Sequence, residues 1–255
     1  MQKIGLVSGA TSGIGKATCV ELAKIGYRLI ICGRRKERLK EVKEQLVNDF
    51  RSDVLTLCFD VQNQAEVINA INSIPENWKS INLLVNNAGL SLGLSAIDEG
   101  DTNDWETMID TNVKGLLWVT KAVLPLLKNS ESPQIINIGS IAGKQTYAMG
   151  NVYCATKHAV AALTDALRID LLAQKIKVTA IHPGAVETEF SVVRFKGDKE
   201  KADKVYDGFS PLTPQDIANA IVYCASLPAH VNINELTIMP LAQASANNWF
   251  KENKI

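Results

Sequence analysis

The chain has 255 residues, and its 27 lysines and arginines balance its 27 aspartates and glutamates. This balance gives no reason to expect a nucleic acid partner, and a content of 46% hydrophobic and 21% charged residues indicates a globular protein rather than a disordered one. No apolar run approaches the roughly 18–20 residues that a membrane span needs, so we expect no membrane partner.

The start of the chain and its cysteines indicate a compartment. A strand-like run begins within the first residues, so we expect no secretory signal. The five cysteines are odd in number and none forms a CxxC pair, which favours reduced thiols in the core of a cytoplasmic protein. The three histidines have no metal-ligand spacing, and we expect no metal.

Short runs of aliphatic and β-branched residues recur along the chain. They are apolar throughout rather than alternating, which is typical of parallel strands that are covered on both faces. The predicted strands are Ile4–Ser8, Arg28–Cys32, Val54–Phe59, Leu83–Asn86, Ile135–Gly139, Val178–His182 and Leu236–Met239.

Segments with helical periodicity lie between these runs. The predicted helices are Gly13–Ile25, Lys36–Phe50, Gln64–Ser73, Thr102–Leu127, Asn151–Ala173 and Pro214–Ser226. Alternation of strand and helix predicts right-handed crossovers. We therefore expect one α/β domain over residues 1–255, built as a Rossmann-like, doubly wound parallel sheet of about seven strands flanked by helices.

One stretch, residues 185–212, interrupts this alternation. It carries clusters of charge together with Gly197 and Gly208. Long irregular insertions in a compact domain usually serve a function, so we expect a substrate loop here. The alternative is a variable surface loop.

A glycine-rich loop joins the first predicted strand to the first predicted helix. Gly9, Gly13 and Gly15 allow a tight turn, and the N–H groups that open the helix suit an anion. The spacing is G-x-x-x-G-x-G rather than the G-x-G-x-x-G of the dinucleotide fingerprint. Such a loop at the first strand–helix junction of an α/β chain indicates a nucleotide site, although a simple turn would use the same glycines.

Residues at the ends of the next two strands indicate which nucleotide binds. Arg34 and Arg35 follow the second strand, where an NAD-selective site carries an acid for the ribose 2′-hydroxyl. Guanidinium groups suit a 2′-phosphate, so we expect NADP(H), unless the two arginines only begin a basic surface helix. Asp60 and Val61 end the third strand, and Asp60 is expected to contact the adenine edge or to cap the next helix.

A tyrosine and a lysine lie four residues apart on one predicted helix. Tyr153 and Lys157 therefore share a helix face. A phenol has a reference pKa of about 10, and a nearby ammonium group would lower that pKa so that the tyrosine exchanges a proton with a substrate. Ser140, after the fifth strand, can hydrogen-bond the same substrate oxygen. Taken alone, such a pair is more commonly an exposed tyrosine and a solvated lysine.

Together these residues resemble the short-chain dehydrogenase/reductase family, and the match covers essentially the whole chain. Ser8 departs slightly, since the family usually has threonine before the first glycine. The matching residues, in the family's order, are Gly9, Gly13, Gly15, Asp60, Asn86-Asn87-Ala88-Gly89, Asn112, Ser140, Tyr153, Lys157, Pro183-Gly184 and Thr188.

The resemblance implies a role for each matched residue. Tyr153 would be the general acid for reduction and the general base for oxidation, while Lys157 would lower its pKa and bind the nicotinamide ribose. Ser140 would position the substrate oxygen, and Asn112 would hold a water that links Lys157 to solvent. The implied cofactor-binding residues are Gly9, Thr11, Ser12, Gly13, Ile14, Gly15, Arg34, Arg35, Asp60, Val61, Asn87, Ala88, Gly89, Tyr153, Lys157, Pro183, Gly184, Val186 and Thr188.

Two later segments, residues 189–198 and 227–234, are similar to the NADP-dependent 3-hydroxy acid dehydrogenases of this family. Those enzymes act on serine, allo-threonine and 3-hydroxypropionate or malonic semialdehyde. A small carboxylate substrate needs a cation, and Arg194 lies in the expected substrate loop. The expected substrate-binding residues are thus Ser140, Tyr153 and Arg194, unless Arg194 is solvated or pairs with a loop acid.

The resemblance also implies a small-molecule substrate and a homo-oligomer, either a tetramer or a dimer. Two other functions stay open. One is an NADPH-dependent reductase of another carbonyl, such as a 3-oxoacyl thioester, a ketosteroid or a pterin side chain. The other is a non-catalytic NADP-binding sensor, because a fold does not by itself imply activity.

Overall fold

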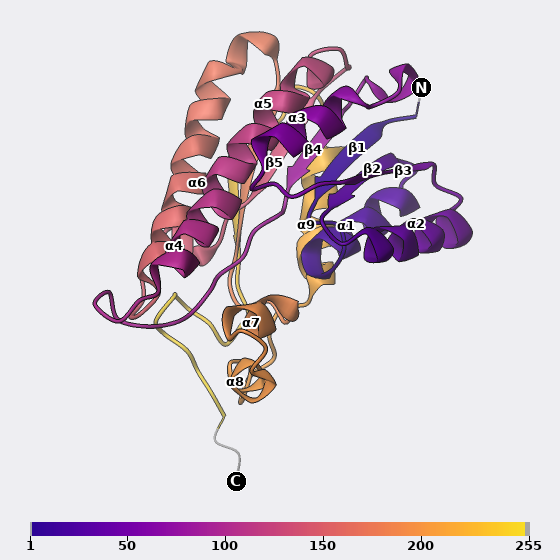
Figure 1. Ribbon diagram of the computed structural model, residues 1–255. Helices are drawn as coiled ribbons and strands as arrows, with labels where there is room; N and C mark the ends of the chain where they lie inside the picture. Colours follow the sequence, from indigo (N-terminus) through magenta and orange to yellow (C-terminus); the bar gives the residue numbers. More distant parts are fainter. Residues whose placement is uncertain (1, 253–255) are drawn as a thin grey trace.

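A computed structural model describes residues 2–252, in which a seven-stranded parallel sheet is covered by helices on both faces (Figure 1). The strand order is β3-β2-β1-β4-β5-β6-β7, so the order reverses between β1 and β4. Ligands bind at such a reversal, outside the carboxyl ends of the strands. The strands are β1 (Ile4–Ser8), β2 (Arg28–Gly33), β3 (Val54–Cys58), β4 (Leu83–Asn86), β5 (Gln134–Ile138), β6 (Lys177–Pro183) and β7 (Glu235–Ile238).

Helices α1, α2 and α9 lie together on one face of the sheet, and α3, α4, α5 and α6 lie on the other (Figure 1). Their bounds are α1 (Gly13–Lys24), α2 (Lys36–Phe50), α3 (Gln64–Asn72), α4 (Thr102–Ile109), α5 (Leu116–Leu127), α6 (Asn151–Asp170) and α9 (Pro214–Ser226). Short 3₁₀ turns occupy Glu76–Trp78, Ile141–Gly143 and Leu172–Gln174.

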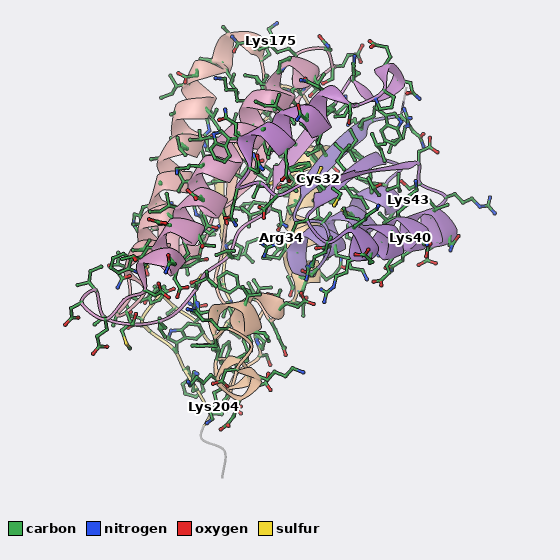
Figure 2. All side chains as sticks on the ribbon, in the orientation of Figure 1. Cys32, Arg34, Lys40, Lys43, Lys175 and Lys204 are labelled. Atoms are coloured by element: carbon green, nitrogen blue, oxygen red, sulfur yellow. The ribbon has the colours of Figure 1, made fainter. Side chains whose placement is uncertain are left out.

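The core forms two apolar layers, one on each face of the sheet. Successive strand side chains point to opposite faces, so Leu6 joins one layer and Val7 joins the other. Both are fully buried, and burying a side chain of this kind stabilises the fold by roughly 1.5–3 kcal/mol. The same rule explains why the central strands are apolar throughout. Figure 2 shows Cys32 among these layers, whereas Lys40 and Lys43 lie on α2 at the surface.

The predicted fold class is confirmed, and most predicted boundaries agree within two residues. The predicted helix Thr102–Leu127 is instead three pieces, because the π-helical segment Asp110–Gly115 separates α4 from α5. The helix predicted to end at Ala173 ends at Asp170. Of the cysteines, all free, Cys58 is exposed rather than part of the core. Within residues 2–252, we find no helix that could cross a membrane.

The expected irregular loop over residues 185–212 is partly helical, so that prediction is wrong in part. It contains α7 (Glu189–Arg194) and α8 (Lys199–Lys204). The side chains of Thr188 and Asp198 cap these helices by accepting backbone N–H bonds, which compensates for their short length. Helices of fewer than two turns carry too little periodicity to be recognised from the chain alone.

Candidate active site

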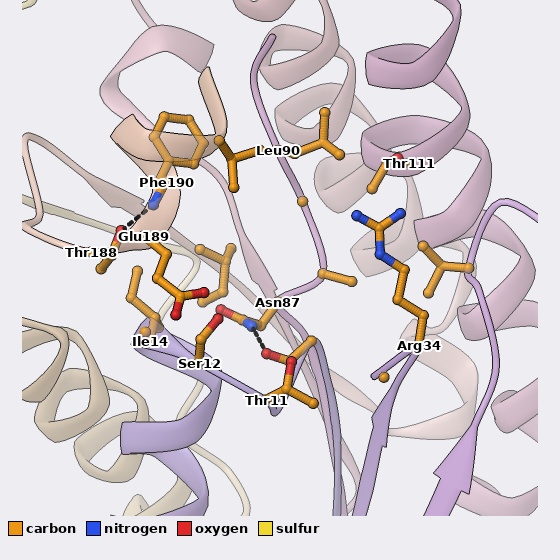
Figure 3. Close-up of a pocket in the computed structure, with 18 of the residues that line it drawn as sticks. Thr11, Ser12, Ile14, Arg34, Asn87, Leu90, Thr111, Thr188, Glu189 and Phe190 are labelled. Carbon is orange, nitrogen blue, oxygen red and sulfur yellow. Dashed lines mark hydrogen bonds between the residues drawn. The ribbon is translucent and has the colours of Figure 1, made fainter. Parts of the chain in front are cut away.

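A cleft of about 310 Å³ lies at the carboxyl ends of the strands, beside the reversal of strand order (Figure 3). It brings together nearly all of the residues predicted for cofactor and substrate. Gly15, Asn112 and Arg194 do not line the cleft itself. The predicted residues that line it are Gly9, Thr11, Ser12, Gly13, Ile14, Arg34, Arg35, Asp60, Val61, Asn87, Ala88, Gly89, Ser140, Tyr153, Lys157, Pro183, Gly184, Val186 and Thr188.

The glycine-rich loop leaves the start of α1 open to an anion. Gly9 and Gly13 have φ angles of +65° and +50°, which glycine adopts without strain. A Cβ at Gly9 would come within 2.9 Å of Ala88, so the loop lies directly against the chain after β4. Ser12 makes no side-chain capping bond, and the first turn of α1 has no acid. The N–H groups there remain available to a phosphate.

The segment after β4 is fixed to this loop by hydrogen bonds. The Ser8 hydroxyl accepts from the backbone N–H groups of Asn87 and Ala88, both at 3.1 Å. The Asn87 amide donates to the carbonyl oxygens of Ser8 and Gly9, at 3.0 and 3.1 Å. Gly15 packs at the same place, because a Cβ there would collide with Gly9. Serine therefore supplies the hydroxyl that this junction needs.

The two arginines after β2 differ in their surroundings. The Arg34 side chain is 60% exposed and lies 3.5 Å from an Asp60 carboxylate oxygen. The Arg35 guanidinium donates to Thr11 Oγ1 at 2.6 Å and to Ser12 Oγ at 2.9 Å, and it also pairs with Glu189 at 3.1 Å. Arg34 is thus more accessible to a ligand, while Arg35 is fixed against the glycine-rich loop.

One buried group on the cleft wall lacks a partner. The Thr111 hydroxyl makes no hydrogen bond among the described residues and faces the cleft near Arg34 (Figure 3). A buried polar atom without a partner costs stability, so such an atom at a cleft fits a site that a polar ligand fills. The open start of α1 offers backbone N–H groups in the same cleft, and Arg34 and Arg35 offer guanidinium groups. The residues present therefore fit a dinucleotide with a 2′-phosphate.

Tyr153 and Lys157 both lie buried on the cleft-facing side of α6. The Lys157 Nζ donates to the Ile138 carbonyl oxygen at 2.9 Å, and burial lowers the pKa of Lys157 to about 8. Burial raises the pKa of Tyr153, and Tyr147 adds to this rise; the Arg194 charge and a Ser140 hydrogen bond oppose it without outweighing it. The predicted lowering of the Tyr153 pKa is therefore wrong for this structure, because desolvation dominates.

Asn112 lies in the π-helical segment and is only 2% exposed. Its amide oxygen accepts from Leu90 N–H at 2.9 Å, and its amide nitrogen donates to the Leu90 carbonyl at 2.8 Å and to Thr156 Oγ1 at 3.1 Å. These bonds join the π-helical segment to the chain after β4 and to α6. A water held by Asn112 for Lys157 stays a prediction.

Arg194 points inward from α7 and not to a loop acid. Its Nε donates to Ser91 Oγ at 3.1 Å, and its Nη2 donates to Tyr147 Oη at 3.0 Å. The guanidinium lies 5.2 Å from the Tyr153 ring centre and 5.0 Å from that of Phe190. A cation therefore lies beside the expected acid–base residue.

Several residues of this region were not predicted as site residues. Ser91, Tyr147 and Phe190 surround Arg194, and Glu189 contacts Arg35. Ser91 and Tyr147 belong to no spaced motif, and only the tertiary fold brings them to Arg194. Glu189 and Phe190 line the cleft and lie in the segment 189–198 that carries the resemblance to the 3-hydroxy acid dehydrogenases. Among residues 2–252, no group of three or more histidines, cysteines or acids could hold a metal ion.

Comparisons with known proteins agree with this geometry. A family model described as short chain dehydrogenase matches residues 3–199. The chain is 48% identical over 244 residues to the NADP-dependent 3-hydroxy acid dehydrogenase YdfG of Salmonella typhi, which covers 95% of this chain and 97% of that one. It is 48% identical over 250 residues, 98% of both chains, to a "Probable NADP-dependent dehydrogenase" of Haemophilus influenzae. A solved closed form of serine dehydrogenase complexed with NADP⁺ is 45% identical, with a TM-score of 0.90 and coverage of 98% of this chain and 100% of that one.

Proposed function

The chain belongs to the short-chain dehydrogenase family, and from that premise we propose that it is an NADP-dependent oxidoreductase acting on a small 3-hydroxy acid. The reaction interconverts the hydroxyl-bearing carbon and a carbonyl. The observation that carries the substrate class is the Arg194 guanidinium beside Tyr153, since a carboxylate substrate needs a cation next to the acid–base group.

Different residues of the chain would bind different parts of the cofactor. The start of α1 and the loop through Gly9 would hold the pyrophosphate, and Arg34 with Arg35 would hold the 2′-phosphate. The adenine would lie near Asp60 and Val61. The nicotinamide end would lie against the remaining cleft residues, which are Asn87, Ala88, Gly89, Tyr153, Lys157, Pro183, Gly184, Val186 and Thr188. When bound, the reduced cofactor supplies the hydride for the carbonyl carbon.

Proton transfer falls to Tyr153. Its raised pKa keeps the phenol protonated at neutral pH, which is the form that donates a proton to the substrate oxygen during reduction. In oxidation the same oxygen must accept a proton, so that direction benefits from higher pH. Ser140 would hold the substrate oxygen beside Tyr153, and Lys157 would bind the ribose. Arg194 would take the carboxylate and so orient the reacting carbon.

An assay panel tests this proposal. Serine, allo-threonine and 3-hydroxypropionate are compared with 3-oxoacyl thioesters, a ketosteroid and a pterin, with the absorbance change of NADP(H) as readout. We expect the 3-hydroxy acids to give the highest kcat/KM. A higher value for any of the other carbonyls would replace the substrate class, and no turnover with any of them would favour a non-catalytic NADP sensor.

We also propose a single domain, a cytoplasmic location and a homo-oligomer. The domain would cover residues 1–255, of which Met1 and residues 253–255 lie outside the described residues. Exposed apolar side chains on α4, α5 and α6, namely Ile109, Leu117 and Ile169, support assembly into a dimer or a tetramer. Light scattering after size-exclusion chromatography tests the assembly, and a monomer would contradict it.

A further inference from the structure

Glu189, the first residue of α7, points into the cofactor cleft toward Ser12 and Thr11 (Figure 3). Its Oε1 accepts from Arg38 Nη1 at 2.7 Å, and its Oε2 accepts from the same nitrogen at 2.9 Å. Oε2 also accepts from Arg35 Nη1 at 3.1 Å. The Glu189 carboxylate therefore pairs with two arginines, Arg35 just before α2 and Arg38 near the start of α2.

Arg35 is one of the two arginines that the proposed function assigns to the 2′-phosphate. Its Nη2 is bonded to Thr11 and Ser12, and its Nη1 is bonded to Glu189. A guanidinium offers two edges to anions, and here a carboxylate already occupies one of them. A phosphate that reaches Arg35 must therefore lie close to the Glu189 carboxylate or displace it.

The carboxylate is ionised under working conditions. Burial acts to raise the pKa of Glu189, but hydrogen bonds and charges from Arg38 and Arg35 outweigh it and hold this pKa below the ordinary value. A 2′-phosphate carries about −1.5 to −2 charges at neutral pH. The two anions repel each other, and they share the same cation. Nicotinamide cofactors without the 2′-phosphate lack this anion and meet the carboxylate only through their pyrophosphate, which NADP(H) carries as well.

The rest of α7 lies over the acid–base residue. The Phe190 ring centre is 5.6 Å from that of Tyr153, and Arg194 binds Ser91 and Tyr147. The Arg38 ion pair is thus a tie between α2 and the helix that covers the substrate position. It survives if the phosphate takes Arg35, because Arg38 bonds both oxygens of the carboxylate.

Building on the proposed function, we propose that Glu189 is a specificity-determining residue with two effects. Its carboxylate competes with the 2′-phosphate for Arg35 and so weakens NADP(H) binding, and its ion pair with Arg38 holds α7 over Tyr153. The Glu189 carboxylate then lowers cofactor affinity while it keeps the substrate site covered. The weaker binding lets the cofactor leave after turnover.

Binding measurements on Glu189→Gln test the competition. The ligands are NADPH, NADH and adenosine 2′,5′-bisphosphate, measured by calorimetry on the intact protein. We expect the variant to bind NADPH and the bisphosphate about 3–10-fold more tightly, a modest gain because the Glu189 side chain is 48% exposed and its charge is partly screened. NADH shares the pyrophosphate but lacks the 2′-phosphate, so its binding should improve by a smaller factor.

Glu37→Gln is the matched control, because Glu37 is an exposed acid in the first turn of α2, close to the same arginines. It removes the same charge without touching α7. If Glu37→Gln gains as much NADPH affinity as Glu189→Gln, the effect comes from the overall charge of the protein, and the proposed competition is overturned. Unchanged or weaker NADPH binding by Glu189→Gln would overturn it as well.

Arg38→Gln breaks the same ion pair from its other end. It removes a positive charge and leaves Glu189 on Arg35, so NADPH binding should weaken, opposite to the effect of Glu189→Gln. Both variants should raise the KM for the 3-hydroxy acid, because both release α7. If NADPH affinity moves in the same direction in both, with melting temperatures equal to that of the wild type, the carboxylate has only a structural role.

Failure of this inference is distinguishable from failure of the proposed function. If the wild-type protein binds NADPH no better than NADH, the proposed cofactor is wrong. If the wild type prefers NADPH but Glu189→Gln does not bind it more tightly, only the role of Glu189 is wrong. Neither binding result depends on knowing the physiological substrate.

Discussion

The Arg194 guanidinium lies 5.2 Å from the centre of the Tyr153 ring, while its Nη2 donates to the phenol oxygen of Tyr147 at 3.0 Å. The cation that α7 contributes is therefore held between two tyrosines. Within residues 2–252, its partners are hydroxyl groups and aromatic rings rather than acids, so they do not neutralise its charge. A substrate carboxylate would be its first anionic partner.

Replacing Arg194 should act selectively on acidic substrates. We expect Arg194→Ala to lower kcat/KM for the 3-hydroxy acid by roughly 10–150-fold, since a charge-assisted hydrogen bond contributes about 1.5–3 kcal/mol. A neutral secondary alcohol of similar size should lose much less. Arg194→Lys should restore only part of the activity, because an ammonium lacks the planar fork. If Arg194→Ala leaves the ratio of the two kcat/KM values, acid to alcohol, unchanged, Arg194 does not bind the substrate.

Removing the transferable proton should abolish most turnover. Tyr153→Phe keeps the ring that packs against Phe190, so folding should be preserved. We expect kcat to fall by about 10²–10⁴-fold, as is usual when a general acid–base group is lost, while NADPH binding changes little. Tyr223→Phe, at an exposed position on α9, is the control. Near-normal turnover by Tyr153→Phe would contradict the assigned mechanism.

Cofactor choice should depend on Arg34. Its side chain is 60% exposed, so its contact with a phosphate is partly screened, and we expect Arg34→Ala to raise the KM for NADPH by roughly tenfold. The KM for NADH should change much less. Lys40→Ala, which removes an exposed cation on α2, serves as the comparison (Figure 2). Equal effects of Arg34→Ala on both cofactors would show that Arg34 does not read the phosphate.

Burial of Lys157 predicts a pH-dependent stability. Its pKa falls to about 8 in the folded protein, below the 10.5 of a free lysine, so the unfolded chain binds more protons between these values. Through this group, stability should rise as pH increases from about 8 to about 10.5. At pH 7, both states carry the charge, and the folded state bears the full cost of burying it.

Lys157→Met tests this linkage through a difference in unfolding free energy. We subtract the unfolding free energy of the wild type from that of the variant. This difference should be about 2–3 kcal/mol more positive at pH 7 than at pH 10. Denaturant titrations at both pH values measure this difference. Lys40→Met changes an exposed lysine and should show almost none. A difference near zero for Lys157→Met would mean that the buried amine keeps an ordinary pKa.

The sequence predicted the sheet and the location of the cleft because both depend on local patterns. Apolar runs mark strands buried on both faces, and Gly9 and Gly13 mark a turn that needs positive φ angles. The pair Tyr153 and Lys157 follows from helical spacing. These features require no knowledge of distant parts of the chain.

Other features of the site depend on tertiary contacts and could not be predicted. The inward direction of Arg194 depends on Ser91 and Tyr147, which are 103 and 47 residues away in the chain. The pKa of Tyr153 depends on how deeply α6 is covered, and spacing alone gave the wrong direction. The two short helices of the loop depend on caps at Thr188 and Asp198, within segments too short to show a period.

The π-helical segment Asp110–Gly115 sets the relative rotation of α4 and α5. Each residue of a helix turns the chain by about 100°, so one extra residue in a turn shifts all later side chains to a different face. Thr111 thereby faces the cleft and Asn112 faces Leu90. Val119 and Val123 still face the sheet. A one-residue deletion here would restore a regular helix yet misdirect one half of it. This segment should therefore tolerate substitutions at exposed Lys114 far better than any change in length.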